Sequence, residues 1–360
     1  MIIGVPREIK DNENRVGLSP AGVKILVEDG HRVLLEKDAG KGSGFPDSIY
    51  LEQGAEIVPS SKDIFSQAEL IVKVKEPLEE EYPLLQEDQL LFTYLHLAAE
   101  PQLTEVLLQK KVAAIAYETV QLPDGSLPLL TPMSEIAGRL APQKGIHYLE
   151  KLQGGKGVLL SGVPGVAPAR VVIIGGGTVG YNAAHVAVKL QADVTLFDIS
   201  LPRLRQLDNI FQGRVKCVMS DPLALTEALR RADLVIGAVL VPGAKTPTVL
   251  TAKMLQVMEE GTVFVDVSID QGGCAETSRP TSHSNPVYKV EGVLHYCVTN
   301  IPGVVPRTSS QALCNATLPY IKELAAKGLR RAIDENPALA KGLNIYRGEI
   351  INEAVAASYR

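Results

Sequence analysis

The stretch Val171-Val172-Ile173-Ile174-Gly175-Gly176-Gly177-Thr178-Val179-Gly180 decides the fold of this chain. A short β-branched apolar run leads directly into the pattern G-x-G-x-x-G. A helical pattern of apolar residues follows, and a second apolar run, Val194 to Phe197, ends on Asp198. This order of strand, glycine turn, helix, strand and acidic residue is the context that a dinucleotide-binding fingerprint requires.

Each glycine of the pattern has an expected role. Gly175 permits the tight turn, Gly177 lets the backbone approach a pyrophosphate, and Gly180 lets the helix pack closely on the strand. The helix that begins at Thr178 offers free N–H groups and a positive dipole end to the phosphates. We expect Asp198 to accept hydrogen bonds from the adenosine ribose and to repel a 2′-phosphate, which favours NAD(H) over NADP(H). The alternative is a glycine-rich turn that binds nothing, and the complete βαβ context argues against it.

The bulk composition is that of an ordinary globular protein. The chain has 360 residues, of which 46% are hydrophobic and 21% charged, enough for two domains with separate cores. A net charge of −5 and the lack of a basic cluster argue against a nucleic-acid partner. Neither a secretory signal nor a membrane-spanning run is evident, and the four cysteines have no metal-binding spacing. We therefore expect a cytoplasmic protein with no membrane partner.

The N-terminal part of the chain, to about residue 125, alternates strand-like runs with helical patterns. Such alternation predicts a mainly parallel sheet with helices on both faces. Helical patterns include Pro20–Asp29 and Pro101–Lys111. The expected strands are Ile2–Val5, Arg32–Glu36, Glu69–Lys75, Gln89–Thr93 and Val112–Tyr117.

The rest of the chain predicts a second sheet and a return to helices. A helical pattern from about Ser134 to Gln153 precedes the fingerprint. Four further buried strands are expected at Val215–Met219, Asp233–Val239, Thr262–Val267 and Leu294–Thr299, and helices at Ser309–Ile333 and Ile345–Ala357. We thus expect an α/β fold of two doubly wound parallel-sheet domains. A Rossmann NAD-binding domain, residues 129–306, would be inserted into a discontinuous substrate (catalytic) domain, residues 1–128 and 307–360.

Polar residues follow several of these strands. In open parallel sheets, ligands bind outside the carboxyl ends of the strands. Arg15 and His96 follow two different strands of the first domain, Lys75 ends a third, Glu69–Lys75, and Asp270 follows Thr262–Val267 of the second domain. If the two sheet edges face one another across a cleft, we expect Asp270 to meet the other three side chains beside the nicotinamide.

The chemistry of this set suits an amino acid or a 2-oxo acid better than a sugar or an alcohol. Arg15 offers a planar fork for a carboxylate, and Lys75 offers a charge for a second oxygen. His96 is suited to proton exchange near neutrality, and Asp270 to orienting water, stabilising a cation or sharing the proton transfer. Taken singly, each has a structural alternative: a solvated arginine, a surface lysine with Lys73 as its local competitor, a structural histidine and a turn-capping aspartate.

The chain resembles the alanine dehydrogenases over essentially its whole length. Three segments carry the resemblance: IGVPREIKDNENRVGLSP near the N-terminus, GGKGVLLSGVPGVAPARVVIIGGGTVG at the fingerprint, and DVSIDQGGCAETSRPT, the segment that contains Asp270. The resemblance implies substrate contacts at Arg15 and Lys75 and proton donor–acceptor roles at His96 and Asp270. It also implies a homohexamer.

For the cofactor, the resemblance implies NAD contacts beyond the fingerprint residues Gly175, Gly177, Thr178 and Gly180. Arg203 stands where some relatives have lysine, and it keeps the charge. A magnesium site of some members needs a histidine where this chain has Lys327, so we expect no metal. The implied contacts are Ser134, Asp198, Arg203, Ser220, Val239, Leu240, Val267, Ser268, Ile269, Asp270, Arg279, Val298, Thr299, Asn300 and Ile301.

The activity that the resemblance implies is the reversible, NAD-dependent oxidative deamination of L-alanine to pyruvate and ammonia. Three alternatives stay open. The first is the NAD(H)-binding component of a proton-translocating transhydrogenase, against which the convergence of Arg15, Lys75 and His96 counts. The second is a saccharopine-type dehydrogenase, which acts on a larger amino acid. The third is an inactive structural or regulatory protein that retains the fold.

Overall fold

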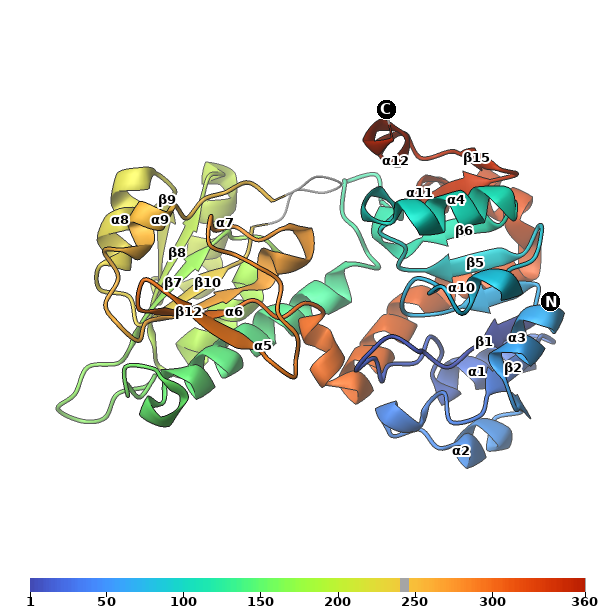
Figure 1. Cartoon of the computed structure of the whole chain (residues 1–360), viewed down its shortest axis with the longest axis horizontal. Helices are drawn as coiled ribbons and strands as arrows, with labels where there is room; N and C mark the ends of the chain where they lie inside the picture. The colour runs from blue at the N-terminus through green and yellow to red at the C-terminus, as the bar shows by residue number, and fades with distance from the viewer. Residues whose placement is uncertain (240–245, 360) are drawn as a thin grey trace. The chain divides into compact units, whose positions relative to one another are not determined.

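The computed structural model describes residues 1–239 and 246–359. Contacts divide the chain into two units, each built around its own sheet (Figure 1). The first unit comprises Met1–Met133 and Gly303–Arg360, and the second comprises Ser134–Pro302. The second unit is therefore inserted between two segments of the first. The expected fold class, an α/β chain with two doubly wound sheets, is confirmed.

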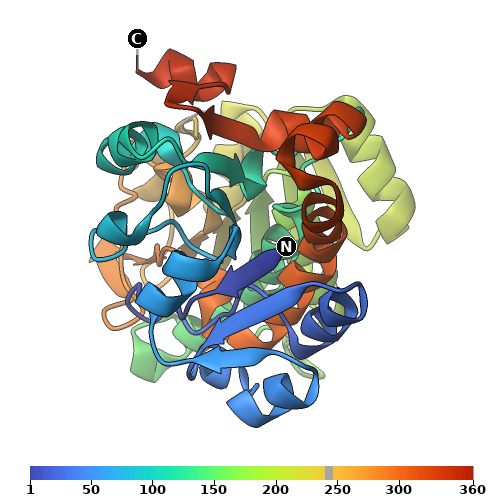
Figure 2. The same ribbon diagram turned by 90° about the vertical axis from the view of Figure 1, so that its right-hand side faces the viewer.

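The first unit has an eight-stranded sheet in the order β15-β14-β6-β5-β4-β1-β2-β3. Strands β1 to β6 run parallel, and β14 and β15 are added antiparallel at one edge. The chain builds β2 and β3 on one side of β1 and then β4 to β6 on the other, so β1 and β4 flank the switch point (Figure 2). The strands are β1 Ile2–Val5, β2 Arg32–Glu36, β3 Glu56–Val58, β4 Leu70–Val72, β5 Leu90–Thr93, β6 Ala113–Ala116, β14 Leu343–Tyr346 and β15 Glu349–Ile350.

The helices of the first unit begin where the sequence supplies caps. Helix α1, Pro20–Glu28, starts after Ser19, whose hydroxyl accepts the N–H of Gly22, and has proline at its first position. Helix α10, Pro306–Glu335, is interrupted at Gly328, which has φ 71° and ψ 167°. The other helices are α2 Asp47–Glu52, α3 Ser61–Gln67, α4 Pro101–Gln109, α11 Pro337–Gly342 and α12 Glu353–Ser358.

The second unit has a seven-stranded sheet in the order β12-β13-β11-β10-β7-β8-β9. Only β12 runs antiparallel among these strands of the described chain. The chain leaves β7 toward β8 and β9 and then returns to β10 on the other side, so the switch point lies between β7 and β10. The strands are β7 Arg170–Ile174, β8 Asp193–Asp198, β9 Val215–Met219, β10 Leu234–Gly237, β11 Val263–Asp266, β12 Val287–Val290 and β13 Val293–Tyr296.

Close packing explains the last glycine of the fingerprint. A Cβ atom at Gly180 would lie 1.8 Å from the carbonyl oxygen of Gly175, so no side chain fits where α6 crosses the turn. Helix α5, Thr131–Leu149, precedes the second unit's sheet along the chain. The remaining helices are α6 Thr178–Lys189, α7 Leu201–Phe211, α8 Pro222–Leu229 and α9 Ala252–Leu255. Within the described ranges, no helix combines the length and the apolarity that a bilayer crossing requires.

One sequence prediction of secondary structure is wrong. The segment Ile345–Ala357 does not form a continuous helix; it ends β14, forms β15 and only then enters α12. The turn residues Arg347 and Gly348 have φ values of 51° and 80°, the left-handed pair that joins two antiparallel strands in a tight hairpin. Strand β14 pairs with β6, and this partner outweighs the helical pattern of the local sequence.

Candidate active site

Three predicted site residues lie at one edge of the first unit's sheet. Arg15 lies in the loop after β1, Lys75 comes three residues after β4, and His96 three residues after β5. Because β4 lies between β1 and β5 and all three are parallel, their carboxyl ends share one edge. Arg15 and Lys75 come from the two strands that flank the switch point, the place where such sheets bind ligands.

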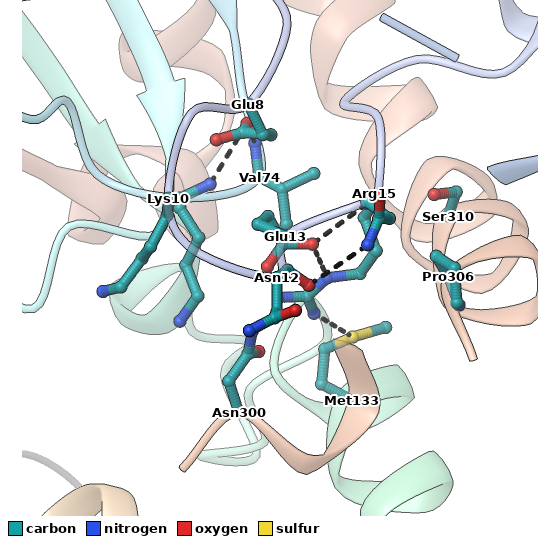
Figure 3. Close-up of polar contacts among 12 residues, drawn as sticks. Glu8, Lys10, Asn12, Glu13, Arg15, Val74, Met133, Asn300, Pro306 and Ser310 are labelled. Carbon is teal, nitrogen blue, oxygen red and sulfur yellow. Dashed lines mark hydrogen bonds and ion pairs between the residues drawn. The ribbon is translucent and has the colours of Figure 1, made fainter. Parts of the chain in front are cut away.

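Arg15 is a buried, oriented cation with only 2% of its surface exposed. The Glu13 carboxylate accepts hydrogen bonds from Nε at 2.7 Å and Nη2 at 2.5 Å, while Nη1 lies 3.2 Å from the sulfur of Met133 (Figure 3). Burial lowers the pKa of Arg15, but the Glu13 carboxylate outweighs burial and leaves that pKa above its usual value. The Glu13 carboxylate thus binds the Nε and Nη2 side of the guanidinium, and the thioether of Met133, a weak acceptor, contacts Nη1.

Burial distinguishes the two candidate lysines. Lys73 is fully buried, and its Nζ lies 3.2 Å from Glu8 and 2.8 Å from Glu81. Burial lowers its pKa, but the two carboxylates raise the pKa to about 12. Lys75 is only half-buried; its N–H donates to Glu8, and its carbonyl accepts from the hydroxyl of Thr93 at 2.9 Å. Lys73 is therefore a structural cation, and Lys75 is the lysine with solvent access.

The backbone of His96 is held in an uncommon conformation. Its φ of 50° and ψ of 37° are left-handed, which costs about 1–3 kcal/mol for a residue with a side chain. The carboxylate of Glu118 stabilises this conformation by accepting the N–H of His96 at 2.6 Å and that of Leu95 at 3.2 Å. The imidazole is 46% exposed, stacks on Tyr94 with ring centroids 5.9 Å apart, and has Nδ1 3.9 Å from Glu118.

Sequence reasoning missed several carboxylates of this site. Glu8 and Glu13 belong to the charged loop that contains Arg15, but the sequence does not say which cation each one meets. Glu118 follows β6, Ala113–Ala116, at the same sheet edge. The rule that ligands bind at carboxyl ends would therefore have found Glu118, had it been applied to that strand as well.

The fingerprint turn of the second unit fits a phosphate group. Gly175 has a φ of 102°, and a Cβ atom there would lie 2.5 Å from the carbonyl oxygen of Ala238. A Cβ atom at Gly177 would meet nothing within 4 Å, so the backbone has an open side at that point. Helix α6 begins at the next residue, Thr178, and its N-terminal N–H groups supply the partners that a phosphate prefers.

Asp198 and Arg203 are both attached to this turn. The carboxylate of Asp198, at the end of β8, accepts the N–H of Gly176 at 2.6 Å and that of Ser200 at 2.7 Å. Nε of Arg203 donates to the carbonyl oxygen of Gly176 at 2.7 Å. An acidic and a basic residue therefore contact the glycine turn that follows β7, and Asp198 lies at the end of β8, where a dinucleotide's adenosine ribose is expected.

Most other predicted cofactor residues also follow parallel strands of this sheet. Ser220 follows β9 and Val239 follows β10, where the Val239 N–H donates to the hydroxyl of Ser268 at 3.0 Å. Arg279 lies with its guanidinium 4.2 Å from the ring centre of Tyr288. Leu240 lies outside the described residues. The remaining members are Ser134 in α5, Val267, Ser268, Ile269 and Asp270 after β11, and Val298, Thr299, Asn300 and Ile301 after β13.

Asp270 lies on a short 3-10 helix, Val267–Gln271, whose first turn is capped by the buried carboxylate of Asp266. Asp266 accepts the N–H of Ser268 at 3.0 Å, the N–H of Cys274 at 2.9 Å and the hydroxyl of Ser278 at 2.6 Å. Burial raises the pKa of Asp266, although these hydrogen bonds act in the opposite direction. Asp270 itself is exposed, and its Oδ1 accepts the N–H of Asn300 at 3.1 Å. Its meeting with Arg15, Lys75 and His96 stays a prediction.

The position that the resemblance linked to a metal carries an ion-paired lysine. Nζ of Lys327 lies 2.7 Å from Glu323 and 2.8 Å from Glu335. Across residues 1–239 and 246–359, no group of three histidine, cysteine or acidic side chains is arranged to hold a metal ion.

Comparison with known proteins places both units in one family. The family domain described as Alanine dehydrogenase/PNT, N-terminal domain, matches residues 4–137, and the corresponding C-terminal domain matches residues 141–353. An alanine dehydrogenase of Methanococcus maripaludis is 57% identical over 360 residues, which cover 100% of this chain and 96% of that protein. An alanine dehydrogenase 2 of Staphylococcus aureus is 55% identical with the same coverage.

Solved structures agree with this result. A structure of an L-alanine dehydrogenase superposes with a TM-score of 0.97 at 55% identity, covering 100% of this chain and 99% of that one. A transhydrogenase from Sinorhizobium meliloti superposes with a TM-score of 0.83 at 21% identity, covering 98% of this chain and 100% of that one. At that identity the likeness to the transhydrogenase concerns the fold alone.

Proposed function

Because this chain belongs to the alanine dehydrogenase/PNT family, we propose that it catalyses the reversible, NAD-dependent oxidative deamination of L-alanine to pyruvate and ammonia. The observation that carries the proposal is the placement of Arg15 and Lys75 on either side of one switch point, with His96 after the next strand. Two cations and a titratable imidazole at one sheet edge match a substrate that has a carboxylate and a nitrogen on the neighbouring carbon. In this proposal, residues 1–128 and 307–360 form the substrate domain and residues 129–306 the NAD-binding domain.

Substrate binding rests on the two cations. Arg15 is kept charged and oriented by Glu13, and its Nη1 side faces Met133. A substrate carboxylate is a far stronger acceptor than the thioether that Nη1 meets, so it would bind at this side of the fork. Lys75 would bind a second substrate oxygen, and the same contacts serve alanine and pyruvate.

The residues at the second unit's switch point would hold NAD. Gly177 with its open side and the N-terminus of α6 would bind the pyrophosphate, and Asp198 the adenosine ribose. When bound, NAD⁺ supplies a hydride acceptor for the hydrogen on Cα of alanine.

His96 and Asp270 would move the protons of the reaction. After the hydride has left Cα, the substrate is iminopyruvate, and a water must add to its imine carbon. His96 takes a proton from this water as the new C–O bond forms, and passes it to the nitrogen. As the C–N bond of the carbinolamine then breaks, the hydroxyl becomes the carbonyl of pyruvate and gives its proton to His96. Ammonia and pyruvate are the products. Asp270 would stabilise the cationic imine or share the proton transfer.

The assay that tests this function follows NADH absorbance with pyruvate and ammonium added to the purified chain. Pyruvate and ammonium together should oxidise NADH, either one alone should not, and larger 2-oxo acids should react more slowly. If NADH binds but none is consumed, the chain is either a binding component of the transhydrogenase kind or an inactive protein that retains the fold. If a larger 2-oxo acid is preferred, the substrate assignment is wrong.

Coenzyme choice gives a first prediction. Asp198→Ala removes the carboxylate that would repel a 2′-phosphate, and we expect the preference for NADH over NADPH to fall by roughly tenfold or more. Asp198→Asn is the matched control for structure, because its amide oxygen retains an acceptor for the N–H of Gly176 without the charge. The ratio of kcat/KM for the two coenzymes measures the effect. An unchanged ratio in both variants would show that the ribose contact is misassigned.

Glu118 gives a second prediction. Glu118→Ala leaves two backbone N–H groups without their acceptor, so we expect a loss of about 1–3 kcal/mol in unfolding free energy. Because His96 would leave its left-handed conformation, turnover should fall roughly tenfold or more, and Glu118→Gln should restore part of it. Thermal unfolding and turnover measure the two effects separately. If a folded Glu118→Ala protein has the turnover of the parent, Glu118 does not position His96.

We also propose that the enzyme is a homohexamer that works in the cytoplasm on small molecules, without nucleic-acid or membrane partners. The resemblance to alanine dehydrogenases supports the hexamer. Light scattering on the purified protein checks it, and a mass other than that of six chains would contradict it.

A further inference from the structure

A buried carboxylate, Glu8, connects the loop that carries Arg15 to the backbone of the segment that carries Lys75. The buried Glu76, next to Lys75, connects the same two segments through its ion pair with Lys10, but by side chains alone. Glu8 lies in the loop after β1 and is 6% exposed. Its Oε1 accepts the N–H of Val74 at 2.6 Å (Figure 3). The same oxygen accepts the N–H of Lys75 at 3.3 Å. Beyond the end of β4 at Val72, these two N–H groups are therefore bound by a side chain and not by a neighbouring strand.

The other oxygen of Glu8 contacts the cation beneath Lys75. Oε2 lies 3.2 Å from Nζ of Lys73, which is fully buried. The carbonyl oxygen of Lys73 accepts the hydroxyl of Tyr117 at 3.0 Å, and that of Lys75 accepts the hydroxyl of Thr93 at 2.9 Å. Thr93, at the end of β5, and Tyr117, directly after β6, thus bind the segment Lys73–Lys75 through its carbonyl oxygens. Glu8 is the partner that comes from the loop of Arg15.

A second buried carboxylate, Glu81, allows a positioning role of Glu8 to be distinguished from a purely structural role. Glu81 shares Lys73 with Glu8 at 2.8 Å, and its other oxygen accepts the N–H of Leu78 at 3.0 Å. None of the described contacts of Glu81 involves the backbone of Val74 or Lys75, or the loop that contains Arg15. Glu8 and Glu81 therefore contribute alike to the charge around Lys73, but only Glu8 touches the backbone of the substrate-binding lysine.

We propose that Glu8 is a positioning residue for substrate binding: its carboxylate sets the place of the Lys75 ammonium relative to the Arg15 guanidinium. The inference rests on the proposed function, in which these two cations bind the carboxylate of alanine or pyruvate. A carboxylate that bridges both loops keeps the two cations at the spacing of one substrate. Loss of that bridge should weaken substrate binding and leave the cofactor contacts of the second unit untouched.

The test compares Glu8→Gln with Glu81→Gln in the whole enzyme. Each change removes one negative charge from Lys73, but only the first replaces the charged acceptor of the Val74 and Lys75 N–H groups with a weaker, neutral amide oxygen. We expect Glu8→Gln to raise the KM for pyruvate roughly tenfold, with a much smaller change in kcat and an unchanged Kd for NADH. Glu81→Gln should leave the KM for pyruvate within about twofold of the parent. Equal effects of the two variants on KM, or none, would overturn the proposal.

A double-mutant cycle makes the test independent of stability. If Glu8 acts through Lys75, Glu8→Gln should raise KM little further in a Lys75→Ala background, whereas independent effects would multiply and contradict the proposal. If Glu8→Gln does not fold, Glu8→Asp retains the charge for Lys73 while withdrawing the acceptor, and it should raise KM in the same way. An active parent with an unchanged KM in these variants refutes the inference alone. A parent that does not consume NADH with pyruvate and ammonium refutes the proposed function and the inference with it.

Discussion

Replacement of His96 by Ala should lower the turnover of pyruvate, ammonium and NADH by roughly 10²-fold or more while leaving the Kd for NADH unchanged. The imidazole lies at the sheet edge that Arg15 and Lys75 share and is half-exposed. The backbone of His96 is bound by Glu118, and the imidazole ring stacks on Tyr94. Its removal takes away the group that accepts a proton from the attacking water. The predicted cofactor residues belong to the second unit, so cofactor binding should not respond.

Two controls sharpen the His96 prediction. His147 is an exposed histidine on α5, and His147→Ala should retain the parental turnover. Added imidazole should restore part of the turnover of His96→Ala, since a small base can enter the space of the lost ring. Near-normal turnover of His96→Ala without imidazole would remove His96 from the chemistry.

The second large effect is expected at Arg15. Arg15→Lys should lower kcat/KM for pyruvate roughly 10²-fold, mainly through KM, because an ammonium cannot bind Glu13 and a substrate carboxylate with a planar fork. Arg15→Ala should also raise the KM for pyruvate and for alanine, but it leaves Glu13 as a buried charge without its cation. Removal of one partner of a buried pair costs about 3–5 kcal/mol, so the alanine variant mixes binding with stability.

The lysine variant separates these effects. Arg15→Lys keeps a cation beside Glu13, and its thermal unfolding should stay closer to that of the parent than the unfolding of Arg15→Ala. Steady-state constants for pyruvate and alanine then report the substrate contact itself. Unchanged constants for both substrates in a folded Arg15→Lys enzyme would contradict the carboxylate contact.

Strands buried on both faces were predictable from the sequence because their signal is local. The structure has β1 at Ile2–Val5 and β2 at Arg32–Glu36, the bounds that their apolar runs predict. The bounds of β9, Val215–Met219, were also predicted, but its expected burial on both faces is wrong, because β9 is a partly exposed edge strand. The segment Ile345–Ala357 was predicted wrongly because its conformation depends on pairing with β6, more than 200 residues earlier in the chain. Edge strands such as β3 and β12 were missed for the same reason, since their partners are not visible in their own short sequences.

The site shows the same division between local and distant information. The positions of Arg15, Lys75 and His96 follow from one rule, that residues after parallel strands share an edge. The choice between Lys73 and Lys75 did not follow, because it depends on which side chain is buried between Glu8 and Glu81. The partners of Glu8 and Glu118 lie 66 and 22 residues away along the chain, and only folding shows which donors they meet.

The most direct test of the central claim is a crystal structure of the enzyme with NAD⁺ and pyruvate. We expect the pyruvate carboxylate within hydrogen-bond distance of Arg15 and Lys75, with His96 and Asp270 reaching the same molecule. Pyruvate bound away from Arg15, or with His96 and Asp270 contacting neither pyruvate nor the cofactor, would contradict it.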